Sequence, residues 1–399
     1  MEPISAVKSS VKVELEDGNE YILIPSRLPF GGSLCPNEFC LISDLITDAV
    51  NDLLENDSWN SDEISSDYCN KIPSLKTLDE GIPFGMTREL SVDIPMSIHG
   101  KADVYIDNII TVAVDMNDNV KRISKAPCTT IIHAVADKSI SSPLPCDNMI
   151  ADNKTFTKGA SEEIKICLGW EINTRELKIS LPLHKYKAWD SQIEEAIKFK
   201  SVKLKTLESI IGRLENVAQI MPMLGHFLNN IRFMQSKASS KKHNVFFSRR
   251  GKEDLKLARK FLIRAKKGLR LNLITFRAPT ITYIGDASKH GLGGFASHGR
   301  AWSFTIPMEL QGRAHINLLE FLTQVVSIWI DIVEGRLKKH DCLLCMGNST
   351  TVMGWLRRSN FEECKKGDKE GDKDWLVKQD IARKLAMLVL DEELLLYQQ

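Results

Sequence analysis

Strict alternation of apolar and polar residues opens the chain. In VKVELEDGNEYILIP (11–25), two alternating runs meet at Asp17-Gly18, a pair that favours a tight hairpin turn. From about residue 38 to 54 the apolar positions instead recur at helical spacing. Two apolar, β-branched runs after Lys101, separated by Asp107-Asn108, predict a second hairpin. Strands and helices are therefore expected to mix in the first part of the chain.

The middle of the chain changes to longer helical patterns. The stretch IKICLGWEINTRELKISL (164–181) predicts a hairpin that turns at Asn173-Thr174. Two helices are expected after it, at about 184–200 and 204–235, because apolar residues there share one helical face. In the second helix that face comprises Leu207, Ile210, Ile211, Leu214, Val217 and Ile220.

The last part of the chain predicts an α+β layered domain. Between residues 279 and 305, ITYIGDAS and the Gly-rich sequence after it indicate three short strands. Helices and strands then alternate, which is typical of layered α+β folds. The expected elements are a helix at 314–334, a strand at 342–347, helices at 350–358 and 375–393, and the start of a further strand.

Charge divides the chain more sharply than its overall composition suggests. The 399 residues are 43% hydrophobic and 26% charged, with a formal net charge of +1, which is ordinary for a protein with a sizeable core. Residues 1–150, however, carry 11 basic and 24 acidic side chains, residues 151–270 carry 26 and 12, and the remainder 16 of each. The basic middle third has the electrostatics of a surface that follows a phosphate backbone.

Cysteines and apolar runs argue for a reducing compartment and against a membrane. The N-terminus has no apolar run, so we expect an intracellular protein, in the cytoplasm or the nucleus. Cys342 and Cys345 form a C-x-x-C pair in an apolar strand, without a second pair at zinc spacing, and are interpreted as buried thiols. The apolar window 318–333 contains Glu320, Gln324 and Asp331, which favours a core helix over a membrane span.

A first candidate site is Tyr105-Ile106-Asp107-Asn108, at the tip of the hairpin after Lys101. Such a tip can present a carboxylate to Mg²⁺ while its strands remain in the core. On spacing alone an ordinary two-residue turn explains the motif better, because Asp-Asn suits a type I′ turn. The sequence blocks before and after this motif decide between a metal-binding tip and an ordinary turn.

The order of three blocks resembles the palm and thumb of retroelement reverse transcriptases. The blocks are LPFGGSLCPNEF, the hairpin with Tyr105-Ile106-Asp107-Asn108, and LGWEINTRELKISLP. The resemblance is closest to the reverse transcriptase and ribonuclease H region of retrotransposon polyproteins. It implies a partial palm over residues 1–160, a basic helical thumb and connection over 161–275, and over 276–399 a ribonuclease H-like α/β layered domain that lacks its last helix.

The resemblance also implies that the polymerase site is incomplete. In the family the hairpin tip reads Tyr-x-Asp-Asp, and a further Asp comes from a strand upstream of the L-P-F-G turn, before this chain begins. Here Asp107 keeps the first tip position, while Asn108 stands at the second. A neutral amide removes one negative charge from a site that must hold Mg²⁺. Polymerase activity is therefore expected to be absent.

A second candidate site lies in the last domain. Asp286 ends an apolar strand, Glu320 lies on the following helix, and Asn348 follows the next strand. Three such positions can converge on metal ions, although a turn residue, a solvated helix position and a helix N-cap would explain them equally well. By resemblance to ribonuclease H, Asp286 and Glu320 match metal ligands, Asn348 replaces a third Asp, and the fourth would lie beyond Gln399.

A basic run from Lys237 to Arg270 contains only Glu253 and Asp254 as acids, and Phe246, Phe247 and Phe261 interleave with it. Lys and Arg bind phosphates without reading sequence, although a solvated helix face is the common alternative. The residues expected to bind nucleic acid are Lys237, Lys241, Lys242, Arg249 and Arg250.

The leading hypothesis is a fragment of a retroelement RNA-directed DNA polymerase with a ribonuclease H-like domain, which binds RNA, DNA or an RNA–DNA hybrid and is catalytically impaired. Remaining activity would depend on Mg²⁺ or Mn²⁺ at Asp107, Asp286 and Glu320. The alternatives are a non-catalytic nucleic-acid-binding remnant and an open-reading-frame relic without function. Complementing polyprotein chains could supply missing parts in either case.

Overall fold

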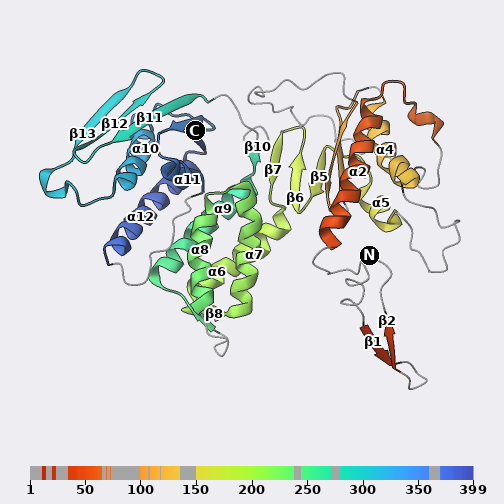
Figure 1. The fold of residues 1–399 in the computed structure, drawn as a ribbon, viewed down its shortest axis with the longest axis horizontal. Coiled ribbons are helices and arrows are strands. Elements are labelled where there is room, and N and C mark those ends of the chain that lie inside the picture. The colour runs from red at the N-terminus through yellow and green to blue at the C-terminus, as the bar shows by residue number, and fades with distance from the viewer. Residues whose placement is uncertain are drawn as a thin grey trace. The chain divides into compact units, whose positions relative to one another are not determined.

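The computed structural model of the chain is an α+β protein (Figure 1). It describes residues 11–14, 20–23, 35–64, 69, 72, 99–106, 108–116, 118–134, 150–237, 244–270, 279–358 and 369–398. The chain divides into two compact units, of which the first comprises residues 1–81 and 93–163 and the second comprises residues 82–92 and 164–399. The predicted boundary at 160/161 lies near this division, and the predicted boundary at 275/276 falls inside the second unit.

The first unit combines two hairpins with helices. The predicted opening hairpin is present as antiparallel β1 (Val11–Glu14) and β2 (Glu20–Leu23). Helix α2 (Cys35–Glu55) covers the predicted helix and packs on α4 (Asn119–Ala134) and on the hairpin of β3 (Lys101–Tyr105) and β4 (Asn108–Val112). A 3-10 turn (Ser61–Glu63) and α5 (Asp152–Lys158) complete the described elements of this unit. The predicted L-P-F-G turn lies outside the described residues.

Two polar side chains fix α2 against its neighbours. The Asn51 amide donates to the carbonyl of Ala102 (3.1 Å) and accepts the Ala102 N–H (2.8 Å), so it pairs with β3 as a strand would. Buried Arg122 donates to the carbonyls of Leu53 and Asn56 at the C-terminal end of α2. The Leu53 carbonyl also accepts the N–H of Asn56 (3.4 Å) and the Asn56 carbonyl that of Trp59 (3.1 Å), so the guanidinium adds a second donor to each at the helix end.

The predicted hairpin at 164–181 is a three-stranded meander. Strands β5 (Ile164–Cys167), β6 (Trp170–Asn173) and β7 (Lys178–Ser180) are antiparallel, and β10 (Leu269–Arg270) extends the sheet beside β7. The additional turn is Leu168-Gly169, where both residues have positive φ (49° and 88°). Glycine at the second position makes this turn accessible, and the single-hairpin prediction overlooked it.

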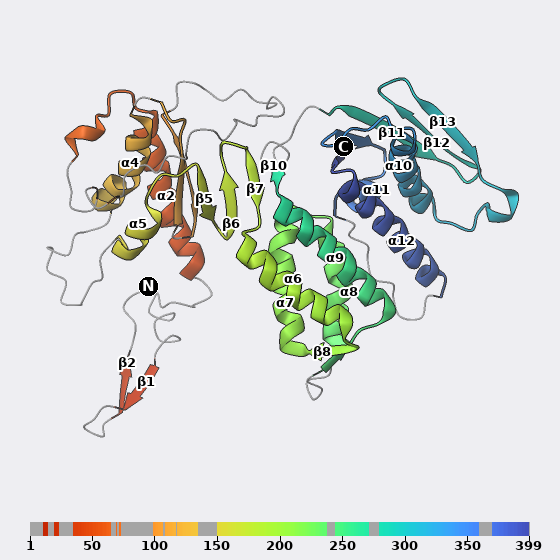
Figure 2. The same ribbon diagram turned by 180° about the vertical axis from the view of Figure 1, so that it is seen from behind.

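Four helices follow this meander: α6 (Leu183–Lys198), α7 (Leu204–Ile220), α8 (Leu224–Lys237) and α9 (Arg249–Lys267). The predicted helix 204–235 is wrong as one element, because it breaks between α7 and α8. Pro222 lies in the break and has no N–H to continue the helical hydrogen bonds. A short antiparallel ribbon, β8 (Ser201–Lys203) with β9 (Asn244–Phe246), lies at one end of the four helices (Figure 2).

The C-terminal module contains a mixed five-stranded sheet with the order β13-β12-β11-β14-β15. The first three strands in sequence are antiparallel, and β14 and β15 run parallel to β11. The elements confirm the α+β layered prediction: β11 (Ile281–Ala287), β12 (Gly291–Ala296), β13 (Ala301–Thr305), a 3-10 turn (Met308–Leu310), α10 (Ile316–Val333), β14 (Cys342–Met346), α11 (Thr350–Arg358), α12 (Lys369–Asp391) and β15 (Leu395–Gln398).

Helix α10 is the central helix of this module. By length and composition it is apolar enough to cross a membrane. It packs on β11 and β12, however, and buries Phe321 and Ile328 completely. Three of its polar side chains, Gln324, Ser327 and Asp331, are also buried and bond to the sheet. The core-helix interpretation of this segment therefore accounts for its composition.

Buried polar side chains join α8, α9 and α12. Asp254 on α9 is completely buried, and it accepts hydrogen bonds from Arg383 on α12 and from Asn230 on α8. Gln379 on α12 donates to the Asn230 side chain (3.1 Å). This cluster, together with His226 on α8, is called the three-helix polar cluster below. It connects the four-helix part of the second unit to its C-terminal module.

Candidate functional site

The hairpin tip in the first unit differs from the predicted turn. Tyr105 pairs with Asn108, so Asn108 is the first residue of β4 and not a turn residue. Ile106 has φ = 58°, a conformation that is strained for a β-branched residue. Asp107 lies outside the described residues. No structural statement about this proposed metal ligand therefore follows.

Parallel pairing of β11 and β14 brings Asp286 and Asn348 to the same end of the sheet in the C-terminal module. Ile284 on β11 is the partner of Met346 on β14. Asp286 lies two residues beyond Ile284, and Asn348 lies two residues beyond Met346, so both follow the same register past the paired ends. Asp286 is exposed, and its carboxylate accepts the N–H of Ala287 (2.8 Å). We call this place the strand edge.

Contacts along α10 place Glu320 at the same edge. Asp331 accepts a hydrogen bond from Tyr283, and two turns earlier the Gln324 amide donates to the carbonyls of Gly285 (3.4 Å) and Met346 (3.0 Å). Following α10 toward its N-terminus thus follows β11 toward its C-terminal end. Glu320 lies one further turn along, beside the strand end that carries Asp286.

Glu320 and Gln324 behave differently in this position. The Oε2 atom of Glu320 is buried and has no hydrogen-bond partner among the residues that the structure describes. Gln324 is 1% exposed and joins the ends of β11 and β14. In the sequence Gln324 stands out only as a polar residue that interrupts the apolar window 318–333, and not as a site residue, although its position four residues after Glu320 on an apolar helix is a detectable signal.

Asn348 is not the N-cap of α11, which was the alternative explanation for this residue. Ser349 immediately precedes the helix, and its Oγ accepts the N–H of Val352 (3.4 Å). The Asn348 side chain is exposed. An amide at this position is therefore left available at the strand edge, where a carboxylate would add negative charge.

The three residues partly fit a divalent cation. A buried carboxylate oxygen without a partner, as in Glu320, is the kind of group that a metal ion satisfies. Asp286 offers a second carboxylate at this strand end, but Gly285 faces Gln324 on α10, so alternation along β11 directs the Asp286 side chain to the other face of the sheet. Asn348 offers a neutral amide oxygen. Among the described residues, however, no group of three or more His, Cys, Asp or Glu side chains could hold a metal ion. The set therefore suits weak binding of one ion better than a tightly held pair.

Only two of the five residues predicted to bind nucleic acid can be placed with their side chains. Lys241 and Lys242 lie outside the described residues, as does the side chain of Lys237. Arg249 and Arg250 form the first turn of α9, where Arg249 is 94% exposed and pairs with Glu253 (3.4 Å). Their role in binding stays a prediction.

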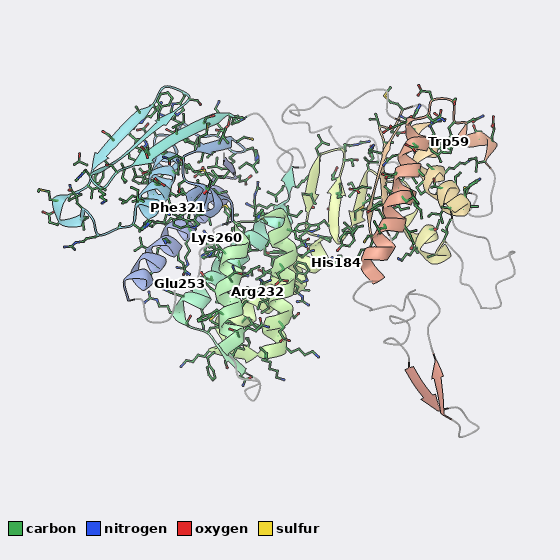
Figure 3. The ribbon with its side chains drawn as sticks, viewed as in Figure 1. Trp59, His184, Arg232, Glu253, Lys260 and Phe321 are labelled. Carbon is green, nitrogen blue, oxygen red and sulfur yellow. The ribbon has the colours of Figure 1, made fainter. Side chains whose placement is uncertain are left out.

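Three further cations of the basic run are ion-paired. Arg259 holds Asp190 of α6 through two hydrogen bonds (2.6 and 2.9 Å). Lys260 pairs with Asp391 (3.4 Å), and Arg264 pairs with Glu393 (3.1 Å). These acids come from remote parts of the sequence, so they do not appear in the local charge count. Figure 3 labels Glu253 and Lys260 on this helix.

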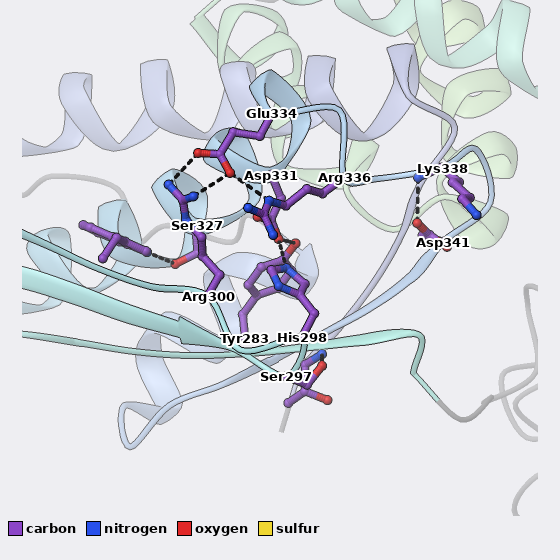
Figure 4. Close-up of polar contacts among 12 residues, drawn as sticks. Tyr283, Ser297, His298, Arg300, Ser327, Asp331, Glu334, Arg336, Lys338 and Asp341 are labelled. Carbon is purple, nitrogen blue, oxygen red and sulfur yellow. Dashed lines mark hydrogen bonds and ion pairs between the residues drawn. The ribbon is translucent and has the colours of Figure 1, made fainter.

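The C-terminal module also contains a buried Tyr–Asp–His arrangement (Figure 4). Asp331 accepts hydrogen bonds from the Tyr283 hydroxyl (2.7 Å) and His298 Nε2 (2.8 Å), while its own side chain is 1% exposed. Burial and the hydrogen bond to Asp331 raise the pKa of Tyr283 far above its usual value. The sequence predicts no role for His298, whereas in the structure its ring connects the turn between β12 and β13 to α10.

Replacing Asp331 with Asn is expected to lower the free energy of unfolding by about 1–3 kcal/mol, because the two donors lose a charged acceptor. Urea unfolding followed by circular dichroism measures the change. Glu334→Gln is the matched control, since Glu334 pairs with Arg300 and Arg336 at the surface and should contribute less than about 1 kcal/mol. Equal losses in the two variants would contradict the assigned role.

The two cysteines of the C-x-x-C pair and two further histidines also have defined environments. Cys342 and Cys345 are completely buried and form no disulfide, and burial raises the pKa of Cys345 to about 12, as expected for packed rather than reactive cysteines. His290 bonds to the Gln311 side chain (2.9 Å), and the His315 ring accepts the N–H of Asn317 as the N-cap of α10.

Comparison with known proteins yields distant structural likenesses only. No family model matches the chain, and no curated protein matches it. A foamy viral protease-reverse transcriptase in complex with an RNA/DNA hybrid covers 97% of the chain at 12% identity and a TM-score of 0.39. The same kind of protein in complex with dsDNA covers 96% at 13% identity and a TM-score of 0.32.

The chain spans 40% and 61% of the length of these two solved chains. A related foamy viral structure with ds DNA covers 75% of the chain at 11% identity and a TM-score of 0.33, over 46% of its own length. With TM-scores below 0.5, these likenesses do not establish the activity of the chain.

Proposed function

We propose that the chain is part of a retroelement-type reverse transcriptase and ribonuclease H region that binds nucleic acid and has little catalytic activity. The observation that carries this proposal is the strand edge. A sheet of order β13-β12-β11-β14-β15 brings Asp286, Glu320 and Asn348 to one end of two parallel strands. That arrangement combines two carboxylates with an amide where a third carboxylate would complete a metal site.

Asp286 and Glu320 are the residues that would hold Mg²⁺ or Mn²⁺ at this edge. The bound ion would polarise a phosphodiester and help generate the attacking hydroxide. The protein scaffold would hold the two carboxylates in place. Gln324 contributes to this because its amide donates to the carbonyls of Gly285 and Met346 and so fixes the strand ends. The intracellular location and the RNA, DNA or hybrid partner belong to the same proposal.

Cleavage of a labelled RNA–DNA hybrid tests the proposal. In Mg²⁺ and in Mn²⁺ we expect weak activity, which Asp286→Asn abolishes. Asn348→Asp is expected to increase cleavage about tenfold or more, because even indirect metal-site partners change affinity or activity on the order of 10- to 100-fold. The Asn348 side chain is exposed and does not cap α11, so the substitution leaves the fold intact.

Ser349→Ala is the matched control, since it alters the neighbouring helix cap without changing charge at the strand edge. Cleavage that Asp286→Asn leaves unchanged would come from a contaminant and would contradict the proposed site. Hybrid binding without cleavage, even in Asn348→Asp, would favour the alternative of a non-catalytic nucleic-acid-binding remnant.

A further inference from the structure

The ribbon of β8 and β9 lies away from the strand edge and has a buried side and an open side. Val202 pairs with Val245, and Val245 is 2% exposed, so one side of the ribbon packs into the core of the helices. Side chains alternate along a strand, so Ser201 and its partner Phe246 belong to the opposite side. Packing of Val202 and Val245 on the helices therefore determines which side of the ribbon faces solvent.

Two aromatic rings are exposed at the ribbon, Phe246 on its open side and Phe199 directly before β8. Phe246 is 69% exposed, and Phe199, two residues before Ser201, is 61% exposed. The Phe199 backbone is extended (φ −85°, ψ 155°), and the chain bends at Phe199 and Lys200 before β8 begins. The carbonyl of Lys200 accepts the N–H of Phe247 (3.1 Å), so Phe199 and Phe246 both adjoin this hydrogen bond at the same end of the ribbon. Neither ring contributes much to the core, so their size is not explained by packing.

Three lysines follow Phe199 closely in the sequence. Lys200, Lys203 and Lys205 are exposed, and none of the described carboxylates forms an ion pair with them. Lys198, nearby at the end of α6, pairs with Glu194 (3.1 Å), and Glu195 and Glu208 are the exposed acids closest in sequence. On α9, by contrast, Arg259, Lys260 and Arg264 are ion-paired.

Exposed aromatic rings between cations suit a ligand with flat rings and negative charges in alternation. An unpaired nucleic-acid strand has this chemistry: bases stack on aromatic faces, and phosphates attract lysine. A duplex hides its base faces within its own stack, so it could use only the lysines. An acidic membrane surface could also use both kinds of group, but by insertion rather than by base stacking.

We propose that the exposed surface formed by Phe246 and Lys203 on the open side of the β8–β9 ribbon, and by Phe199 and Lys200 directly before β8, binds single-stranded RNA or DNA. This surface is separate in residues from the strand edge and from the predicted basic positions on α9. It needs no metal and no cleavage, so it can hold an unpaired strand whether or not the strand edge is active.

Fluorescence anisotropy with the full chain and a labelled 12-nucleotide oligo(dT) or oligo(U) tests this inference. Phe199→Ala/Phe246→Ala is expected to weaken binding about tenfold or more, given the usual contribution of base stacking. Lys200→Gln/Lys203→Gln is expected to reduce the slope of log K against log salt by about 1.4, or 0.7 for each lost phosphate contact. An abasic strand of equal length should bind the Phe variant and the original chain equally.

Matched controls use exposed residues of the C-terminal module. Phe304→Ala/Trp329→Ala removes two exposed rings, and Lys338→Gln/Lys339→Gln removes two exposed lysines. Both control variants should bind the labelled strand as the original chain does. Thermal melting of all four variants should be unchanged, because the replaced side chains lie at the surface.

Three outcomes would overturn the inference. If the Phe variant keeps its affinity while the Lys variant loses it, binding is general electrostatic attraction without a stacking site. If a duplex competes as well as the single strand, the open bases are not recognised. If the chain instead sediments with phosphatidylserine vesicles in a Phe199- and Phe246-dependent manner and shows no preference for the strand over its abasic form, the surface binds membranes. Activity at the strand edge affects none of these readings.

Discussion

Replacing Asp254 with Ala is expected to lower the free energy of unfolding by about 3–5 kcal/mol, the usual cost of breaking a buried ion pair by removing one partner. Asp254 is completely buried, and it accepts two hydrogen bonds from Arg383 (2.9 and 2.8 Å) and one from Asn230 (3.0 Å). Its removal leaves the Arg383 guanidinium, which is 13% exposed, without its buried partner. Urea unfolding monitored by circular dichroism measures the loss.

The neighbouring residue provides the control for this prediction. Glu253 on the same helix pairs with Arg249 at the surface, so Glu253→Ala should cost less than about 1 kcal/mol. Asp254→Leu/Arg383→Met should recover much of the stability lost in Asp254→Ala, because it removes both charges and keeps the volume. A loss below about 1 kcal/mol in Asp254→Ala would mean that water or other groups already satisfy Arg383.

The unfolding free energy is also expected to fall as the pH is lowered from about 6.5 toward 3. Burial, and then the positive charge of Arg383, lower the pKa of His226 from 6.5 to about 3. The unfolded chain therefore takes up a proton on His226 in a range where the folded chain does not. The stabilisation is complete above pH 6.5 and decreases by up to about 1.4 kcal/mol for each pH unit below it.

Urea unfolding at pH 7, 6, 5 and 4 measures this dependence. His226→Gln removes the titrating ring, so its stability should fall less steeply with acid than that of the original chain, whatever its value at pH 7. His184→Gln is the control, because His184 is exposed at the start of α6 (Figure 3). Parallel pH profiles for the original chain and His226→Gln would show that His226 does not remain unprotonated in the folded protein.

Most of the C-terminal module could be predicted because its pattern is local. Helix α11 has the predicted bounds, and α10 and β14 differ from the prediction by at most two residues. Two errors occurred where a single turn decides the element. Leu168-Gly169 divides an apparent single strand, and Pro222 divides an apparent single helix. Short turns interrupt a periodic pattern too briefly for the pattern itself to reveal them.

The candidate site was harder to predict, because residue types do not give contacts. Asp286 and Glu320 could be selected from their positions at a strand end and on the next helix. The buried Oε2 of Glu320, the role of Gln324 and the cap by Ser349 depend on packing between distant segments. The charge run gave a similar difficulty, since Asp190, Asp391 and Glu393 neutralise cations far away in sequence.

The hydrogen bonds of Gln324 determine how easily mutation could restore a carboxylate at position 348. They hold the ends of β11 and β14 together without any contribution from Asn348. Codons for Asn and Asp differ by one base, so a single point mutation would restore a carboxylate to a scaffold that is already in place. One base change could therefore reverse the loss of charge at position 348. Loss of Gln324 would instead remove the hydrogen bonds that hold the ends of β11 and β14 together.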